Sequence, residues 1–115
     1  MAVLENPIFK KRFFIYCYKC HKDIEVRIND EKRRKLNIGD TLVFLKRPLE
    51  DEEIRAKVVG LEYYDFFENL VDHYDMERIY LEGYTKEEYL NEMKRFYTRE
   101  EQEQYGVVAI IFEKE

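Results

Sequence analysis

The sequence is poor in glycine and has no long apolar run. Its four glycines are scattered among 115 residues and form neither a dinucleotide-binding nor a P-loop motif. A regular alternation of strand and helix patterns is also missing, which argues against a doubly wound parallel sheet. The longest strongly apolar run near the start, residues 13–18, is too short for a signal-peptide core or a membrane span. We therefore expect a soluble, cytoplasmic protein.

Cysteine is also scarce, and both copies lie close together. Cys17 and Cys20 are followed by His21, which completes the C-x-x-C-H pattern of haem attachment. Three functions of such a pair are disfavoured. Haem attachment needs export and a distal ligand, and a thioredoxin-like redox pair needs a helix directly after it. Structural zinc needs a second well-spaced pair of ligands. His73 is the only other histidine. We expect two reduced thiols and neither metal, haem nor another cofactor.

Charged side chains, in contrast, make up 39% of the chain and are unevenly distributed. Residues 1–47 carry 12 Lys and Arg against 6 Asp and Glu, whereas residues 48–115 carry 8 against 19. The basic half either binds an anionic partner or neutralises the acidic half across the fold. The length and the 45% hydrophobic content predict a single folded domain spanning residues 1–115.

Local patterns predict a mixture of strands and helices. Residues 8–20 fit a helix and a strand equally well. Asn29 and Asp30 can cap a short helix, and Asp65 can cap another that runs to about His73. Thr85 with Glu88 and Thr98 with Glu101 have the spacing of capping boxes. Expected strands are residues 23–28, 41–46, 54–64 with a bend at Gly60, and 107–112; expected helices are 31–36, 65–73 and a longer one after Thr85.

The strand at residues 23–28 carries the candidate functional residues. Its apolar residues alternate with charged ones, so Glu25 and Arg27 share the face opposite the apolar one and the strand should be half-buried. A solvated face with cross-strand ion pairs would have the same pattern. The core is expected to comprise Ile24, Val26, Ile28, Leu42, Phe44, Val58, Val107, Ala109 and Ile111.

Several segments together resemble the ASCH family. Residues 22–27 are similar to its G-x-K-x-x-E-x-R signature, with Cys20 at the glycine position. The basic residues 30–36, the run from Gly39 to Phe44, the aromatic motif at 63–66 and the segments at 96–97 and 105–110 follow in the family's order. The resemblance covers about residues 20–112.

This resemblance implies a fold and a function. The fold would be α+β, a PUA-like mixed β-barrel of about five or six strands with two or three helices. The function would be binding of RNA or a nucleotide in a basic cleft, without a membrane. The binding residues would be Lys22, Glu25, Arg27, Arg33 and Arg34.

Two alternatives remain open. The first is a hydrolase of RNA or of a modified nucleoside that uses Lys22 and Glu25 as catalytic residues. Relatives that hydrolyse modified cytidine have a threonine at the Glu25 position, so binding is expected ahead of catalysis. The second alternative is a protein-interaction module.

Overall fold

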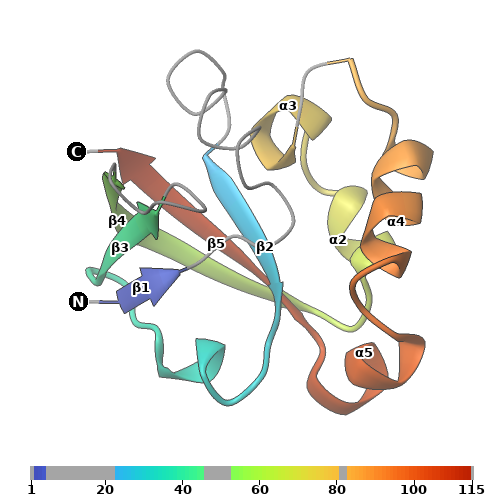
Figure 1. Ribbon diagram of the computed structural model, residues 1–115, viewed down its shortest axis with the longest axis horizontal. Coiled ribbons are helices and arrows are strands. Elements are labelled where there is room, and N and C mark those ends of the chain that lie inside the picture. The colour runs from blue at the N-terminus through green and yellow to red at the C-terminus, as the bar shows by residue number, and fades with distance from the viewer. Residues whose placement is uncertain (1, 5–22, 46–52, 81–82, 115) are drawn as a thin grey trace.

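The computed structural model describes residues 2–4, 23–45, 53–80 and 83–114. A five-stranded mixed sheet has the strand order β1-β3-β4-β5-β2, and short helices gather on one side of it (Figure 1). The strands are β1 (Ala2–Leu4), β2 (Ile24–Ile28), β3 (Thr41–Leu45), β4 (Glu53–Tyr64) and β5 (Val107–Lys114). The helices are α2 (Phe67–Val71), α3 (Met76–Ile79), α4 (Lys86–Lys94) and α5 (Arg99–Tyr105), with a 3-10 turn, η1 (Arg33–Lys35).

Four of the strands form a curled antiparallel half-barrel. Strand β4 pairs with β3 on one side and with β5 on the other, and β5 pairs with β2. The register of β4 against β5 shifts between Val58 and Gly60, which is where the sequence predicts a bend. A side chain at Gly60 would press on Ile111, since its Cβ would lie 3.2 Å from the Ile111 Cδ1 atom. The described strands thus support an α+β half-barrel.

Strand β1 pairs in parallel with β3, and the sequence patterns do not predict it. It has only three residues, too few for an alternation to be recognised. The predicted helix-or-strand segment at residues 8–20 lies outside the described residues, as do Cys17 and Cys20. Across the described ranges there are four short α-helices and one 3-10 turn, more than the two or three helices expected.

Both predicted capping boxes are confirmed. The Thr85 and Thr98 hydroxyls accept hydrogen bonds from the Glu88 and Glu101 backbone N–H groups, and the glutamate side chains accept in return from the threonine N–H groups. The predicted cap at Asp65 is wrong, because α2 begins one residue later with Phe66 at its N-cap and no side-chain cap. Asp30 does accept from the Arg33 N–H at 3.1 Å, but the helix that follows is the single turn η1.

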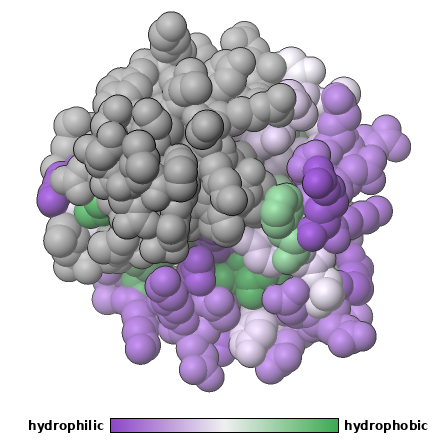
Figure 2. Space-filling model, in the orientation of Figure 1, coloured by the Kyte–Doolittle hydropathy of each residue, from purple (hydrophilic) through white to green (hydrophobic). Residues whose placement is uncertain are grey.

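The core extends over both faces of the central strands. Seven of the nine expected core residues are buried: Ile24, Val26, Ile28, Leu42, Val58, Val107 and Ala109. Ile111 is partly buried and packs against them, while the Phe44 side chain lies outside what the structure describes. The helices contribute Phe67, Leu70, Val71, Ile79, Tyr89 and Met93 to the core. Hydrophilic residues cover the described surface over α4 and α5 (Figure 2).

Candidate functional site

Glu25 and Arg27 lie side by side in β2, but neither faces solvent. Register places Glu25 opposite Ile110 and Arg27 opposite Val108, so these four side chains share one face of the sheet. Glu25 is 0% exposed and Arg27 is 1% exposed. The prediction of a half-buried strand is therefore wrong, since β2 is covered on both faces. The two side chains form an ion pair, with Arg27 Nη2 donating to Glu25 Oε2 at 3.5 Å.

The buried pair lies within electrostatic reach of helix α4. Burial raises the pKa of the Tyr89 phenol well above its usual range, and the Glu25 charge raises it further while Arg27 lowers it. A charged pair removed from water is stabilised mainly by its own attraction and by the hydrogen bonds around it. The geometry therefore gives Glu25 and Arg27 a role inside the fold, and their predicted contact with nucleic acid stays a prediction.

The residue before this strand is held firmly in place. Arg78 of α3 donates two hydrogen bonds to the Asp23 carboxylate, from Nε at 2.9 Å and from Nη2 at 3.1 Å. The Asp23 backbone is tied as well, because its N–H donates to the Arg78 carbonyl and its carbonyl accepts from the Phe112 N–H. Lys22 lies outside the described residues, so its predicted role, in binding or as a catalytic residue with Glu25, stays a prediction. Lys22 directly precedes the firmly held Asp23 in the sequence.

The two predicted arginines of the basic turn are only partly free. Arg33 donates to the Asp30 carboxylate at 3.3 Å. Arg34 donates from Nε to the Asn29 carbonyl at 2.8 Å and from Nη2 to the Tyr105 carbonyl at 3.5 Å, and its guanidinium lies 5.8 Å from the centre of the Tyr105 ring. Arg34 therefore links the end of β2 to the end of α5, and it remains exposed.

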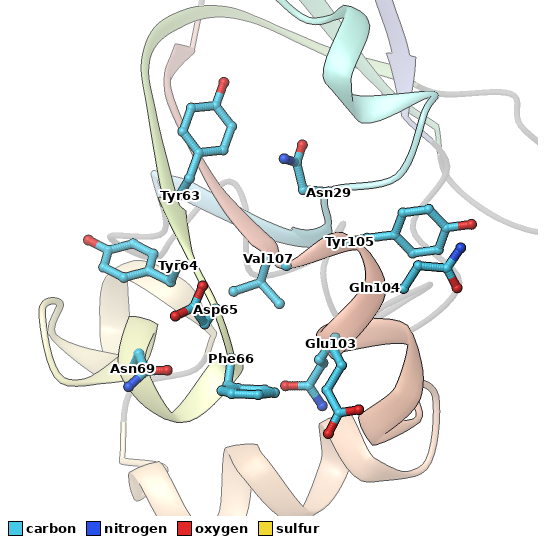
Figure 3. Close-up of a pocket in the computed structure, with 12 residues that line it drawn as sticks. Asn29, Tyr63, Tyr64, Asp65, Phe66, Asn69, Glu103, Gln104, Tyr105 and Val107 are labelled. Carbon is cyan, nitrogen blue, oxygen red and sulfur yellow. The ribbon is translucent and has the colours of Figure 1, made fainter.

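A pocket of about 720 Å³ opens beside this arginine, at the C-terminal end of β2. Asn29 and Tyr63 lie at one end of it, Phe66 and Glu103 lie at the other, and Val107 lies between them (Figure 3). Three segments far apart in the sequence build it. The lining residues are Asn29, Tyr63, Tyr64, Asp65, Phe66, Asn69, Gln102, Glu103, Gln104, Tyr105, Gly106 and Val107.

Two hydrogen bonds hold the segments of the pocket together. The Gln102 side chain accepts from the Phe67 N–H at 3.1 Å, which joins α5 to the start of α2. Gly106 ends α5 with a φ of +72°, and its carbonyl accepts from the Asn29 N–H at 2.9 Å. A Cβ at Gly106 would lie 3.0 Å from the Tyr64 carbonyl oxygen. This close approach of β4 and β5 requires glycine, because other residues disfavour this backbone region.

The pocket combines flat aromatic rings with polar side chains. Tyr63 is 59% exposed, and Phe66 and Tyr105 are partly exposed. Asn29, Asn69 and Gln104 contribute amides, while Asp65 and Glu103 contribute carboxylates. A second arginine borders the far end, where the Arg99 guanidinium lies 3.5 Å from the centre of the Phe66 ring and Nη1 donates to Glu68 at 2.6 Å. Such a lining suits a planar ligand with hydrogen-bonding edges.

A tyrosine cluster supports one wall of the pocket from behind. Tyr64 and Tyr74 both donate to Glu62 Oε2, at 3.0 and 2.8 Å, and their hydroxyls lie 3.1 Å apart. Burial raises the pKa of both phenols above the usual value, and these hydrogen bonds raise the pKa of Tyr74 further. The His73 ring lies 5.0 Å from the Tyr64 ring. The cluster therefore ties β4 to the segment between α2 and α3.

Sequence reasoning missed this pocket, although parts of it were visible. The aromatic motif at residues 63–66 was identified only as part of the family resemblance, and Asn29 was expected only as a helix cap. Pairing of β2 and β4 with β5 brings the two together, and no local pattern predicts that pairing.

In the described part of the chain, no group of three His, Cys, Asp or Glu side chains is placed to hold a metal, and no helix is long and apolar enough to cross a membrane.

Comparison with known proteins places the fold but gives no activity. No family model and no curated protein matches the sequence. The structure is similar to the crystal structure of hypothetical protein PH0355, with a TM-score of 0.84 and 28% identity over 100% of both chains. It is also similar to the solution NMR structure of protein PF0455 from Pyrococcus furiosus, with a TM-score of 0.75 and 27% identity over 99% of this chain and 97% of that one.

Proposed function

We propose that this protein binds single-stranded RNA or a nucleotide, as a member of the ASCH family with a PUA-like fold. The observation that carries the proposal is the pocket lined by Tyr63, Phe66 and Tyr105, with the basic turn attached to its rim through Arg34. The curled half-barrel and the G-x-K-x-x-E-x-R-like segment support the same family.

Base stacking would supply much of the binding free energy. An exposed aromatic ring that stacks on a base contributes about 1–3 kcal/mol per base, and it does so for bases of any sequence. Tyr63 presents such a ring, since 59% of its surface is exposed. Unstacked bases are accessible in single-stranded RNA but not inside a duplex. The proposal therefore specifies a single strand or a free nucleotide.

Phosphate groups would lie at the rim and not inside the pocket. The carboxylates of Asp65 and Glu103 line the interior and would repel a phosphate. Arg34 and the exposed Lys32 and Lys35 lie along η1, outside the pocket. These side chains would neutralise the phosphates of an RNA backbone that follows η1. Lys22 is expected to contribute a further positive charge.

The buried pair has a supporting role in this proposal. Arg27 cannot approach a phosphate while it is 1% exposed and bonded to Glu25. We propose that the pair fixes β2, which carries Lys22 before one end and Asn29 after the other. Glu25 is equally enclosed as a catalytic acid or base, so the geometry favours binding over hydrolysis.

Titration of fluorescent single-stranded RNA at two salt concentrations tests the proposal. Affinity should fall as salt rises, because each neutralised phosphate releases counterions. Tyr63→Ala should weaken binding by about fivefold or more through lost stacking. Arg34→Ala should weaken binding and flatten the salt dependence.

Arg95→Ala is the matched control for Arg34→Ala. Arg95 follows α4, is 70% exposed in its side chain and pairs only with Glu92 among the described acidic residues. The substitution removes the same charge at a residue outside the pocket lining, so binding should stay near wild type. The proposal is wrong if wild type shows no salt-sensitive binding, or if the two arginine variants weaken binding equally. Either result would favour a protein-interaction module.

A further inference from the structure

We infer that the pocket selects nucleobases that carry an exocyclic amine, namely adenine, cytosine and guanine, over uracil. This inference rests on the proposed function and adds a substrate preference to it. The pocket contains carboxylates whose acceptor capacity is unused, and these share the lining with the rings of Tyr63, Phe66 and Tyr105. The selection would come from the donor groups at the edge of the base.

The first step concerns the acceptors in the pocket. Asp65 and Glu103 are both exposed, and within the described segments neither forms an ion pair or accepts a hydrogen bond through its side chain. The Oδ1 atom of Asn29 is also an acceptor without a donor from the described residues. Three acceptor groups at the pocket wall, two carboxylates and one amide oxygen, thus lack an N–H or O–H partner among the described residues.

The second step concerns the donors, several of which are already used. The Gln102 amide is occupied at both ends, by the Phe67 N–H and by the Thr98 carbonyl. The Tyr64 hydroxyl donates to Glu62, and the Arg99 guanidinium is bonded to Glu68. The remaining amides, those of Asn29, Asn69 and Gln104, can donate or accept, as can the Tyr63 and Tyr105 hydroxyls. Both charged side chains in the pocket lining, Asp65 and Glu103, are acceptors.

The third step is the match to a base edge. Exocyclic amines of cytosine, adenine and guanine donate hydrogen bonds, and carboxylates accept from them. Uracil presents two carbonyl oxygens on either side of one N–H. Those oxygens would face the Asp65 or Glu103 carboxylate, where no proton is available, so uracil would lose a bond and meet repulsion. Cytosine and uracil have nearly the same shape, which makes them a sharp pair for a test.

Fluorescent oligocytidine and oligouridine of eight nucleotides, titrated at the same salt, provide the test. The two probes have the same charge and length, so counterion release cancels between them. We expect oligocytidine to bind about tenfold more tightly, as a base-edge contact commonly discriminates by this amount or more. Equal affinities, or tighter binding of oligouridine, would overturn the inference while leaving the proposed function intact.

A pair of glutamate variants separates edge recognition from general charge. Glu103→Gln and Glu100→Gln remove one charge each from the same exposed helix α5, but only Glu103 lines the pocket. Both should tighten the binding of oligouridine slightly through reduced repulsion. The pocket variant combines Glu103→Gln with Asp65→Asn, and its control combines Glu100→Gln with Asp72→Asn. The cytosine preference should fall at least threefold in the pocket variant and persist in the control.

The remaining outcomes are also decisive. If the preference stays the same in the pocket variant and in its control, it comes from the stacking of the free RNA and the inference is wrong. If neither oligonucleotide binds wild type, the proposed function fails and the inference fails with it. Circular dichroism of each variant should match wild type, because all four substitutions are isosteric and at exposed positions.

Discussion

Arg27 donates a hydrogen bond to Glu25 at 3.5 Å inside the protein, with the two side chains 2% and 0% exposed. These residues are two positions apart on one strand and point the same way. Their sequence pattern is that of a charged surface, yet they are among the most buried side chains in the described structure. The relationship therefore gives this pair a role inside the fold, and its predicted contact with RNA stays a prediction.

Removal of one member of this pair should destabilise the fold strongly. Glu25→Ala leaves the Arg27 charge buried without its carboxylate, and breaking a buried pair typically costs about 3–5 kcal/mol. The double substitution Glu25→Met with Arg27→Met should cost less than the sum of the two single Met substitutions, because neither charge is then left behind. Urea unfolding of wild type and these four variants measures these differences. A cost below about 1 kcal/mol for Glu25→Ala would contradict a buried, paired carboxylate.

The Asp23–Arg78 pair should stabilise the entry to β2 by a smaller amount. Its side chains are 41% and 37% exposed, so solvent screens the attraction, but the two-fold hydrogen bonding is favourable geometry. A double-mutant cycle with Asp23→Ala and Arg78→Ala should give a coupling of about 0.5–1 kcal/mol that decreases in high salt. The same cycle on Glu92 and Arg95, a single exposed pair, should give a smaller coupling. Equal couplings would mean that the geometry at Asp23 adds nothing.

Substitution of Gly106 should be more harmful than substitution of Gly39. Both have positive φ, +72° and +99°, so alanine is strained at either position. Only at Gly106 would the new Cβ also meet a backbone atom, the Tyr64 carbonyl at 3.0 Å. We expect Gly106→Ala to lower the free energy of unfolding by about 1 kcal/mol more than Gly39→Ala. Thermal unfolding of both variants checks this, and equal losses would show that β4 and β5 can separate at little cost.

Stability should decrease at alkaline pH because of the tyrosine cluster. Burial and the hydrogen bonds with Tyr64 and Glu62 raise the pKa of Tyr74 above the usual value of 10.0. A folded pKa above the unfolded one adds stability that is complete below pH 10.0 and is lost as pH rises beyond it. The free energy of unfolding should therefore fall above about pH 10.

Tyr74→Phe isolates this effect. It removes the phenol that donates to Glu62 at 2.8 Å, so it should cost about 1 kcal/mol at neutral pH. Its stability should then fall less steeply above about pH 10 than that of wild type. Chemical unfolding at pH 7, 9 and 11 compares the two slopes. Parallel slopes would show that ionisation of Tyr74 does not cause the loss of stability at alkaline pH.

Local interactions let the sequence determine much of this protein by itself. The capping boxes at Thr85 and Thr98 follow from hydrogen bonds within four residues, and the strands at β2 and β5 follow from alternation or a continuous apolar run. Gly60 marks the irregularity in β4 because it lacks a side chain that would press on Ile111. Each of these features depends on neighbours in the chain or on one residue's own conformational freedom.

Only the tertiary structure decided what covers each face and which segments meet. Alternation in β2 shows that its two faces differ, but it cannot show that the face with Glu25 and Arg27 is also enclosed. The pocket depends on the pairing of β5 with both β2 and β4, which brings Asn29 and Tyr63 to the same end of the sheet. The pairing of β2 with β5 joins residues far apart in the sequence, from Ile24 with Ile111 to Ile28 with Val107. The stability of such contacts comes from packing across the fold, to which local sequence patterns are insensitive.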